Sequence, residues 1–259
     1  MYKFGSVEKK IYSLRNEHPL ILPQIDPDKY TTKTANNWFK RIEELNLQVI
    51  VIGSSIISNK LHLQNLMNIA VNDFKFDVLF YINGMAGIKG IDGKSAVYWS
   101  QIPNSLNTFF GWDGLISNSL NLSKSNFEPI PTIYVFDFRG SIGTSNWLTR
   151  SNPVPREKPE ISLAIAKAAE YSGIRFYIMA GGSGSNLPPP ETHIKKISKL
   201  SNLFLIPTSG ITTLKHAKSM FSSGADAIHI GNLLEKEKGF KILNEIVKIS
   251  KNYSGKDFL

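Results

Sequence analysis

Short apolar runs alternate with longer amphipathic segments along this chain. The runs consist mostly of Val, Ile, Leu, Phe and Tyr without polar alternation, as expected of parallel strands that are buried on both faces. Eight runs predict strands: residues 20–25, 48–52, 78–82, 96–99, 132–136, 176–179, 203–206 and 227–230. Eight such strands with helical pattern between them predict an α/β fold of the TIM (β/α)8 barrel type.

The segments between the apolar runs predict the helices of this barrel. Seven of them have a helical period: residues 35–45, 60–74, 104–121, 160–172, 190–200, 214–223 and 239–251. Residues 83–95 contain four glycines and no helical period, so we expect the barrel to lack its third helix. A chain of 259 residues fits one barrel, which predicts a single domain spanning residues 1–259.

The amino-acid composition restricts the kinds of binding partner that the protein can have. The net charge of +9 comes from 24 Lys and only 6 Arg, and no run of five basic residues occurs, which argues against a nucleic-acid partner. A positive field still favours an anionic small molecule. The absence of cysteine excludes disulfides and cysteine-ligated metals. No apolar segment reaches the ~18 residues of a membrane span and no leader opens the sequence, so we expect a cytoplasmic protein.

Barrel enzymes build their active sites from the loops that follow the strands. Asp26 follows the first predicted strand, where a carboxylate can bind Mg²⁺ or, alternatively, cap a turn. Gly53, Ser54 and Ser55 follow the second, where they can approach a phosphate or a metal, or form a plain turn. Aromatic residues around the third and fourth strands predict either an apolar channel or ordinary packing: Tyr81, Tyr98, Trp99, Phe109, Phe110 and Trp112.

The last three strand ends predict an anion site. Small residues, including Ser183 and Gly184, follow the sixth strand, and Tyr177 within that strand is expected to point inward. Ser209 with Gly210 follows the seventh strand, and Gly231 with Asn232 follows the eighth. The loops after the last two strands form the recurrent phosphate site of such barrels, so we expect a phosphorylated ligand. The five histidines have no metal-ligand spacing, and we assign them to surface or core.

Taken together, these motifs resemble the geranylgeranylglyceryl phosphate synthase family, from about residue 20 to residue 235. They include Asp26-Pro27-Asp28, Gly53-Ser54-Ser55, Pro155-Arg156-Glu157 and the stretch Gly-Ala-Asp-Ala-Ile-His-Ile-Gly-Asn at 224–232. The resemblance implies a barrel without its third helix that transfers a prenyl chain from geranylgeranyl diphosphate to sn-glycerol 1-phosphate in archaeal ether-lipid synthesis. Bacterial relatives use a longer chain.

The resemblance also implies site residues and partners. Asp26 and Ser54 would hold Mg²⁺ on the diphosphate, with no other cofactor. The glycerol phosphate would be bound by Tyr177, Ser183, Gly184, Ser209, Gly210, Gly231 and Asn232. A homodimer and peripheral contact with a membrane are the expected assemblies.

Four places depart from the family pattern: the sixth strand, the sixth loop with one extra glycine, the seventh loop, and Tyr81-Ile82-Asn83-Gly84, which stands where the family has Pro-Gly after the third strand. The glutamate expected two residues after the tyrosine of the sixth strand is Met179, which cannot act as a base, so the catalytic residue is unknown. The glycine-rich seventh loop reads Thr-Ser-Gly-Ile-Thr at 208–212. Three interpretations stay open: a working prenyltransferase, a catalytically lapsed paralogue that binds prenyl diphosphate or serves as a non-catalytic subunit, and another phosphate-binding barrel enzyme such as a phosphosugar isomerase.

Overall fold

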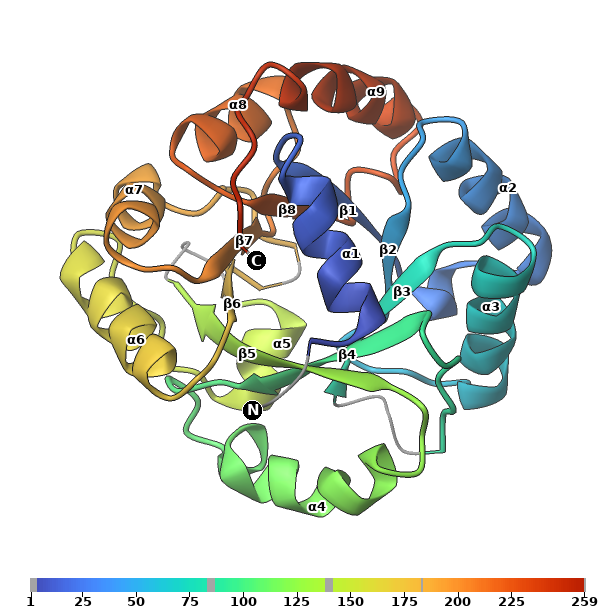
Figure 1. The fold of residues 1–259 in the computed structure, drawn as a ribbon, viewed down its shortest axis with the longest axis horizontal. Helices are drawn as coiled ribbons and strands as arrows, with labels where there is room; N and C mark the ends of the chain where they lie inside the picture. The colour runs from blue at the N-terminus through green and yellow to red at the C-terminus, as the bar shows by residue number, and fades with distance from the viewer. Residues whose placement is uncertain (1–3, 83–86, 138–141, 183, 259) are drawn as a thin grey trace.

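Eight parallel strands form a barrel in the computed structural model, which describes residues 4–82, 87–137, 142–182 and 184–258 (Figure 1). The strands are hydrogen-bonded in the order β7-β6-β5-β4-β3-β2-β1-β8. Their bounds are β1 Leu20–Ile25, β2 Val49–Ile52, β3 Asp77–Tyr81, β4 Ser95–Gln101, β5 Glu128–Phe136, β6 Phe176–Ala180, β7 Phe204–Thr208 and β8 Ala227–Ile230. All eight predicted strands are confirmed, with ends shifted by a few residues.

Helices surround the barrel (Figure 1). Their bounds are α1 Ser6–Arg15, η1 Pro27–Lys29, α2 Thr32–Glu43, α3 Lys60–Asn72, η3 Thr108–Phe110, α4 Trp112–Leu122, α5 Thr144–Thr149, α6 Pro159–Tyr171, α7 Glu191–Leu200, α8 Leu214–Ser222 and α9 Gly239–Ser250. Residues 87–94, in the connection from β3 to β4, contain no helix. This agrees with the prediction that the helix between the third and fourth strands is missing. Among the described residues, no helix is long and apolar enough to cross a membrane.

Three helical features differ from the sequence prediction. The helix predicted over 104–121 begins only at Trp112, because Asn107 caps the short helix η3 and Gly111 separates it from α4. Helix α1 was not predicted, since its buried apolar side chains are only Val7, Ile11 and Tyr12. Helix α5 was also missed, because a six-residue helix is too short to establish a period.

Asp226 closes the barrel where β7 meets β8. Its backbone N–H donates to the carbonyl of Leu205 at 2.9 Å, and its side-chain Oδ2 accepts from the backbone N–H of Leu205 at 2.8 Å. One residue therefore provides both hydrogen bonds across this seam, because its backbone and its side chain contact the same neighbour.

The strands separate two packed layers, and alternate residues of each strand belong to different layers. On β6, Phe176 and Ile178 pack in the barrel interior, whereas Tyr177 and Met179 pack in the cluster that includes the outer helices. This alternation decides which side chains can reach a ligand in the barrel.

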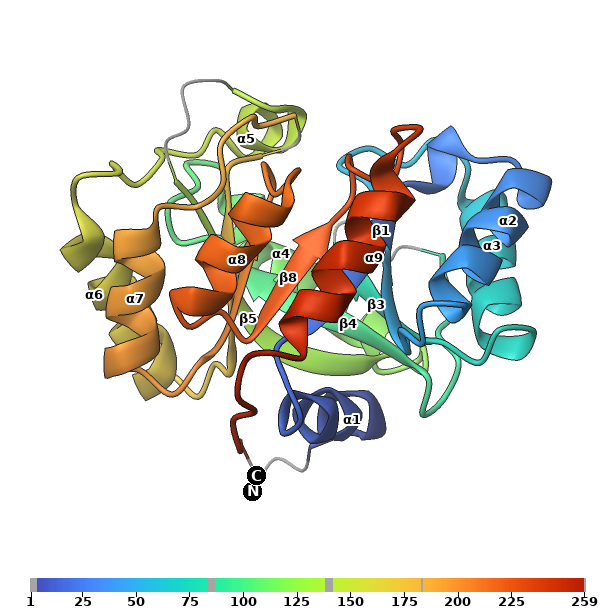
Figure 2. The ribbon, with the colours of Figure 1, turned by 90° about the horizontal axis from the view of Figure 1, so that it is seen from above.

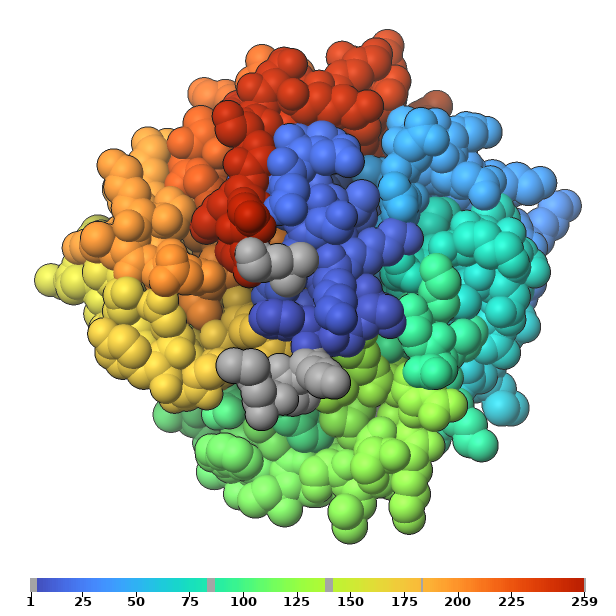
Figure 3. All heavy atoms as spheres, in the orientation of Figure 1, coloured from blue at the N-terminus to red at the C-terminus, as the bar shows by residue number. Residues whose placement is uncertain are grey.

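Helix α1 covers one end of the barrel, beside the C-terminal segment (Figures 2 and 3). Its Val7, Ile11 and Tyr12 complete the interior cluster. Two ion pairs fix it there, because Arg15 contacts Asp226 at 3.2 Å in a buried pair and Glu8 accepts from half-buried Arg175 at 2.7 Å. The end of the barrel that α1 covers is therefore closed, and a ligand must use the other.

Candidate functional site

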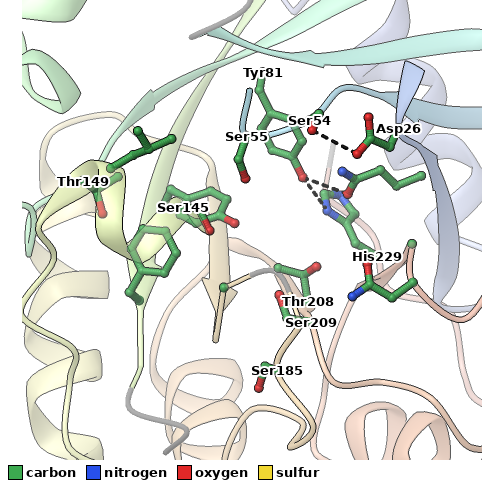
Figure 4. Close-up of a pocket in the computed structure, with 18 of the residues that line it drawn as sticks. Asp26, Ser54, Ser55, Tyr81, Ser145, Thr149, Ser185, Thr208, Ser209 and His229 are labelled. Carbon is green, nitrogen blue, oxygen red and sulfur yellow. Dashed lines mark hydrogen bonds between the residues drawn. The ribbon is translucent and has the colours of Figure 1, made fainter. Parts of the chain in front are cut away.

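A cavity of about 400 Å³ opens at the carboxyl ends of the strands (Figure 4). This is the end at which barrel enzymes bind their substrates. Helix α1 lies at the other end of the barrel (Figure 2). The lining of the cavity differs from one side to the other. Hydroxyl, carboxylate and glycine residues come from the loops after β1, β2 and β6 to β8, whereas the wall formed by β4, β5, η3, α4 and α5 is largely apolar.

Asp26 and Ser54 meet at the ends of β1 and β2. The Ser54 hydroxyl donates to Asp26 Oδ2 at 3.0 Å, and Asp26 Oδ1 accepts from the backbone N–H of Asp28 at 3.1 Å (Figure 4). The turn-capping alternative for Asp26 is thus realised at Oδ1, whereas Oδ2 faces Ser54 in the cavity. The pair offers two hard oxygen ligands of the kind that Mg²⁺ prefers.

A second carboxylate lies at the mouth of the cavity. Glu235 accepts from Lys29 Nζ at 2.7 Å, and the same ammonium lies 3.9 Å from Asp26 Oδ2. Among the residues that the structure describes, no cluster of three or more His, Asp or Glu side chains could hold a metal. A cation here would take its remaining ligands from a substrate and from water, which is how Mg²⁺ is usually bound beside phosphates.

The loops after the last three strands line the opposite side of the cavity. The predicted residues Gly184, Ser209, Gly210, Gly231 and Asn232 all contribute to this lining. Ser209 and Gly210 adopt positive φ angles of 65° and 68°, so the loop keeps a left-handed backbone even where serine stands instead of glycine. A Cβ on Gly210 would lie 1.9 Å from the Leu187 carbonyl oxygen, which explains why this position requires glycine.

Apolar side chains form the wall between these two polar regions. They are Ile102, Phe109, Phe110, Leu115, Phe136 and Leu148. The expected aromatic channel is therefore present in part, since Phe109, Phe110 and Tyr81 line the cavity. Tyr98 is buried beneath it, and Trp112 is 67% exposed on α4.

Polar aromatic residues form the floor. His229 Nε2 lies 2.8 Å from the Tyr98 hydroxyl, and its Nδ1 lies 3.3 Å from the Tyr81 hydroxyl (Figure 4). Burial lowers the pKa of His229 to about 3, so its imidazole is neutral at physiological pH. Burial also raises the pKa of Tyr81 well above its usual value, with smaller contributions from Tyr134 and Tyr98.

The structure corrects the expectation for Tyr177. This side chain was expected to point inward, but it is fully buried in the outer layer and does not line the cavity. Its neighbour across that layer is Ser162 on α6, and burial raises the pKa of the phenol. The residues of β6 that face the barrel interior are the alternate ones, Phe176 and Ile178.

Met179 shares the outer face with Tyr177 and is also fully buried. A carboxylate at this position would lie among apolar side chains rather than in the cavity. The predicted residue Ser183 lies outside the described residues.

Sequence reasoning missed part of the site. Gln24 and His229 line the floor, Lys29 and Glu235 lie at the mouth, and Ser145 on α5 reaches the cavity. The period of the strands offered a signal for the first two, because Gln24 and Asp26 lie on β1 and just after it, and His229 lies two residues before Gly231.

Comparison with known proteins identifies the relatives of this chain. The model of the PcrB family matches residues 12–250. The chain belongs to the PcrB family. The geranylgeranylglyceryl phosphate synthase of Pyrococcus horikoshii is 29% identical to this member over 239 residues, which are 92% of each chain. The synthase of Methanosphaera stadtmanae is 30% identical over 247 residues, with 94% of this chain and 99% of the relative covered.

Solved structures agree with the fold of this PcrB-family chain. (S)-3-O-geranylgeranylglyceryl phosphate synthase from Thermoplasma acidophilum, solved with its substrate sn-glycerol-1-phosphate, superposes with a TM-score of 0.84 at 20% identity and covers 94% of this chain and 98% of its own. The enzyme from Thermoplasma volcanium also gives 0.84, at 22% identity, and covers 96% and 98%. The predicted family and the barrel fold are confirmed.

Proposed function

We propose that this protein is a Mg²⁺-dependent prenyltransferase that joins the prenyl chain of geranylgeranyl diphosphate to sn-glycerol 1-phosphate. One observation carries the proposal: a single cavity combines the Asp26–Ser54 oxygen pair, an apolar wall and glycine-bearing loops after β7 and β8. A prenyl diphosphate and a phosphorylated alcohol together need these three surfaces. The names of the curated relatives support the same pair of substrates.

The diphosphate belongs to the side formed by β1 and β2. Asp26 and Ser54 fit a magnesium ion, because their oxygens converge at the cavity wall and leave the other coordination positions to phosphate and water. The bound ion would neutralise charge on the departing diphosphate. The apolar wall around Phe109 and Phe110 would then exclude water from the allylic carbon.

The acceptor phosphate belongs to the opposite loops. Gly210 and Gly231 allow the backbone to approach an anion closely, and Ser209 and Asn232 add polar side chains at the same rim. Gly184 completes this side of the cavity.

The experiment that tests this proposal is a radiolabelled transfer assay. The full chain is incubated with Mg²⁺, geranylgeranyl diphosphate and sn-glycerol 1-phosphate, beside a panel of other phosphorylated alcohols, and diphosphate binding is measured on the same preparation. We expect prenyl ether product only with Mg²⁺. Tight diphosphate binding without any product would instead identify a non-catalytic paralogue.

Asp26→Ala provides the residue-level test. We expect Mg²⁺-dependent binding of the diphosphate to fall by about 100-fold or more, because a hard anionic ligand is lost. Asp113→Ala, on the exposed surface of α4, is the control for loss of an aspartate. Unchanged diphosphate affinity in Asp26→Ala would refute the metal assignment.

A further inference from the structure

A chain of neutral hydrogen-bonding groups runs across the cavity floor from Tyr98 on β4 to Gly53, which follows β2. It joins Tyr98 to His229, His229 to Tyr81, Tyr81 to Gln24 and Gln24 to the carbonyl oxygen of Gly53. The distances are 2.8, 3.3, 3.3 and 3.0 Å in that order. Each group comes from a different strand or the residue after it, so the chain links five of the strands that build the cavity, β4, β8, β3, β1 and β2.

The Gly53 end of this chain fixes the direction of every hydrogen bond. Gln24 Nε2 donates to the Gly53 carbonyl, so Gln24 Oε1 faces Tyr81 and accepts a hydrogen bond from its hydroxyl. The Tyr81 oxygen must then accept from His229, which makes Nδ1 the protonated nitrogen of that imidazole. His229 Nε2 is left to accept from the Tyr98 hydroxyl. The low pKa of His229 keeps this arrangement unchanged over the physiological pH range.

Packing contacts hold the Tyr81 ring in place, in addition to the hydrogen bonds of its hydroxyl. The ring lies against Gly53, where a Cβ would approach Tyr81 Cδ2 to 3.0 Å. It also contacts the rings of Tyr98 at 5.6 Å and Tyr134 at 6.3 Å between centroids. Tyr81 itself is only partly buried and lines the cavity.

The position of Tyr81 relates both halves of the site. Gln24 lies two residues before Asp26, and Gly53 directly precedes Ser54, so one side of the chain adjoins the diphosphate region. His229 lies two residues before Gly231, so the other side adjoins the phosphate loops. The Tyr81 hydroxyl is directed at the space between them (Figure 4).

We propose that Tyr81 is a positioning residue for the acceptor alcohol, an inference that rests on the function proposed above. A phenol oxygen has two lone pairs, of which His229 occupies one, while the phenol proton goes to Gln24. The second lone pair accepts a hydrogen bond from the substrate hydroxyl. This hydrogen bond orients the alcohol so that one of its oxygen lone pairs faces the allylic carbon.

The chemistry balances without a base on the protein. The alcohol oxygen forms a bond to the allylic carbon, and the bond from that carbon to the diphosphate oxygen breaks. The alcohol proton becomes acidic as the ether bond forms, leaves its hydrogen bond to Tyr81 and is taken up by the released diphosphate. Tyr81 remains a protonated phenol throughout, because its pKa is raised. The role of Tyr81 is to orient the acceptor alcohol. Met179 cannot do this, because its side chain faces the outer layer and not the cavity.

The test compares Tyr81→Phe with the wild type. The variant keeps the ring and removes the hydroxyl. We expect kcat with sn-glycerol 1-phosphate to fall about tenfold, as for loss of one hydrogen bond in the transition state. The dissociation constant for geranylgeranyl diphosphate with Mg²⁺ should stay within about twofold, because the diphosphate region is untouched. Tyr253→Phe, whose hydroxyl donates to the Lys218 carbonyl on the outer surface, is the matched control.

The outcomes separate this inference from the proposed function. Wild-type turnover in Tyr81→Phe would overturn the role of Tyr81 while the prenyltransferase stands. An equal loss of diphosphate affinity and kcat would also overturn it, since the ring hydroxyl would then only support the cavity. A wild-type protein that makes no product with any acceptor would refute both.

A spectroscopic measurement tests the chain without turnover. The ¹⁵N chemical shifts of His229 are expected to report the Nδ1–H tautomer, and Tyr98→Phe should change the shift of the unprotonated Nε2. Observation of the Nε2–H tautomer in the wild type would overturn the assignment of Tyr81 as an oriented acceptor.

Discussion

The two ends of the barrel are both polar, but they use polar groups differently. At the end that α1 covers, charged side chains are paired with one another, as in the buried pair of Arg15 with Asp226 and the pair of half-buried Arg175 with buried Glu8. At the open end, the ion pair of Lys29 with Glu235 is partly exposed and the other polar groups line a cavity. The closed end therefore stabilises the fold, and the open end is available for ligands.

This difference has a physical cause. Buried charges must be paired, because an unpaired charge in a low dielectric is very costly, so a change at the closed end affects the whole barrel. Exposed charges are screened by water and by salt, so charged residues at the open end can be exchanged at little cost in stability. Substitutions at the two ends should consequently separate stability from binding.

The largest effect is expected for Asp226→Leu. This change leaves Arg15 as a buried cation and removes the acceptor of the Leu205 N–H at the barrel seam. We expect the free energy of unfolding to fall by about 3–5 kcal/mol, measured by urea titration. The double variant with Arg15→Met should recover part of that loss, since no buried charge then remains unpaired at this pair. A loss below ~1 kcal/mol would contradict the contrast between the ends.

His229 lies between the two ends and should make stability depend on acid. Its folded-state pKa of about 3 lies below the usual 6.5, so the unfolded chain binds a proton that the folded barrel does not. Stability is therefore lost as the pH falls from 6.5 toward 3, by about 3 kcal/mol at pH 4. We expect His229→Gln to remove this part of the acid dependence in unfolding experiments, whereas His18→Gln serves as the control. An unchanged acid profile in His229→Gln would argue against the buried neutral imidazole.

Glycine positions at the open end provide a matched pair. Gly210→Ala forces a Cβ to within 1.9 Å of the Leu187 carbonyl oxygen at a φ of +68°, so we expect a loss of about 2–3 kcal/mol. At Gly231 the nearest atom to an added Cβ is 3.7 Å away, and the same substitution should cost less than about 1 kcal/mol. Thermal unfolding of both variants checks the pair. Equal losses would mean that the loop after β7 relaxes freely.

How far the sequence predicts this molecule depends on the range of the interactions concerned. The strands follow from local apolar runs, and Asp26, Ser54, Gly210 and Gly231 follow from the rule that strand ends meet, so all four line the predicted cavity. The facing of Tyr177 and Met179 could not be read in the same way, because β6 is apolar on both faces and a one-residue shift exchanges them.

Long-range contacts were equally hidden. Tyr98 and His229 are 131 residues apart in sequence, and only barrel closure brings them to 2.8 Å. Helix α1 escaped prediction for the same reason: its few apolar residues are meaningful only against the barrel interior that they cover. Tertiary packing, rather than local propensity, decides such elements.

The smallest effect is expected for Lys29→Met at the open end. The Lys29 side chain is 47% exposed, and its ion pair with Glu235 is screened by solvent, so we expect the free energy of unfolding to change by less than about 1 kcal/mol. That change should shrink further at high salt, in contrast to the loss in Asp226→Leu, which salt should leave almost intact. Urea titrations of both variants at low and high ionic strength make the comparison. A salt-insensitive loss of several kcal/mol in Lys29→Met would show that the open end, like the closed one, depends on a structural ion pair, and the separation of stability from binding would fail.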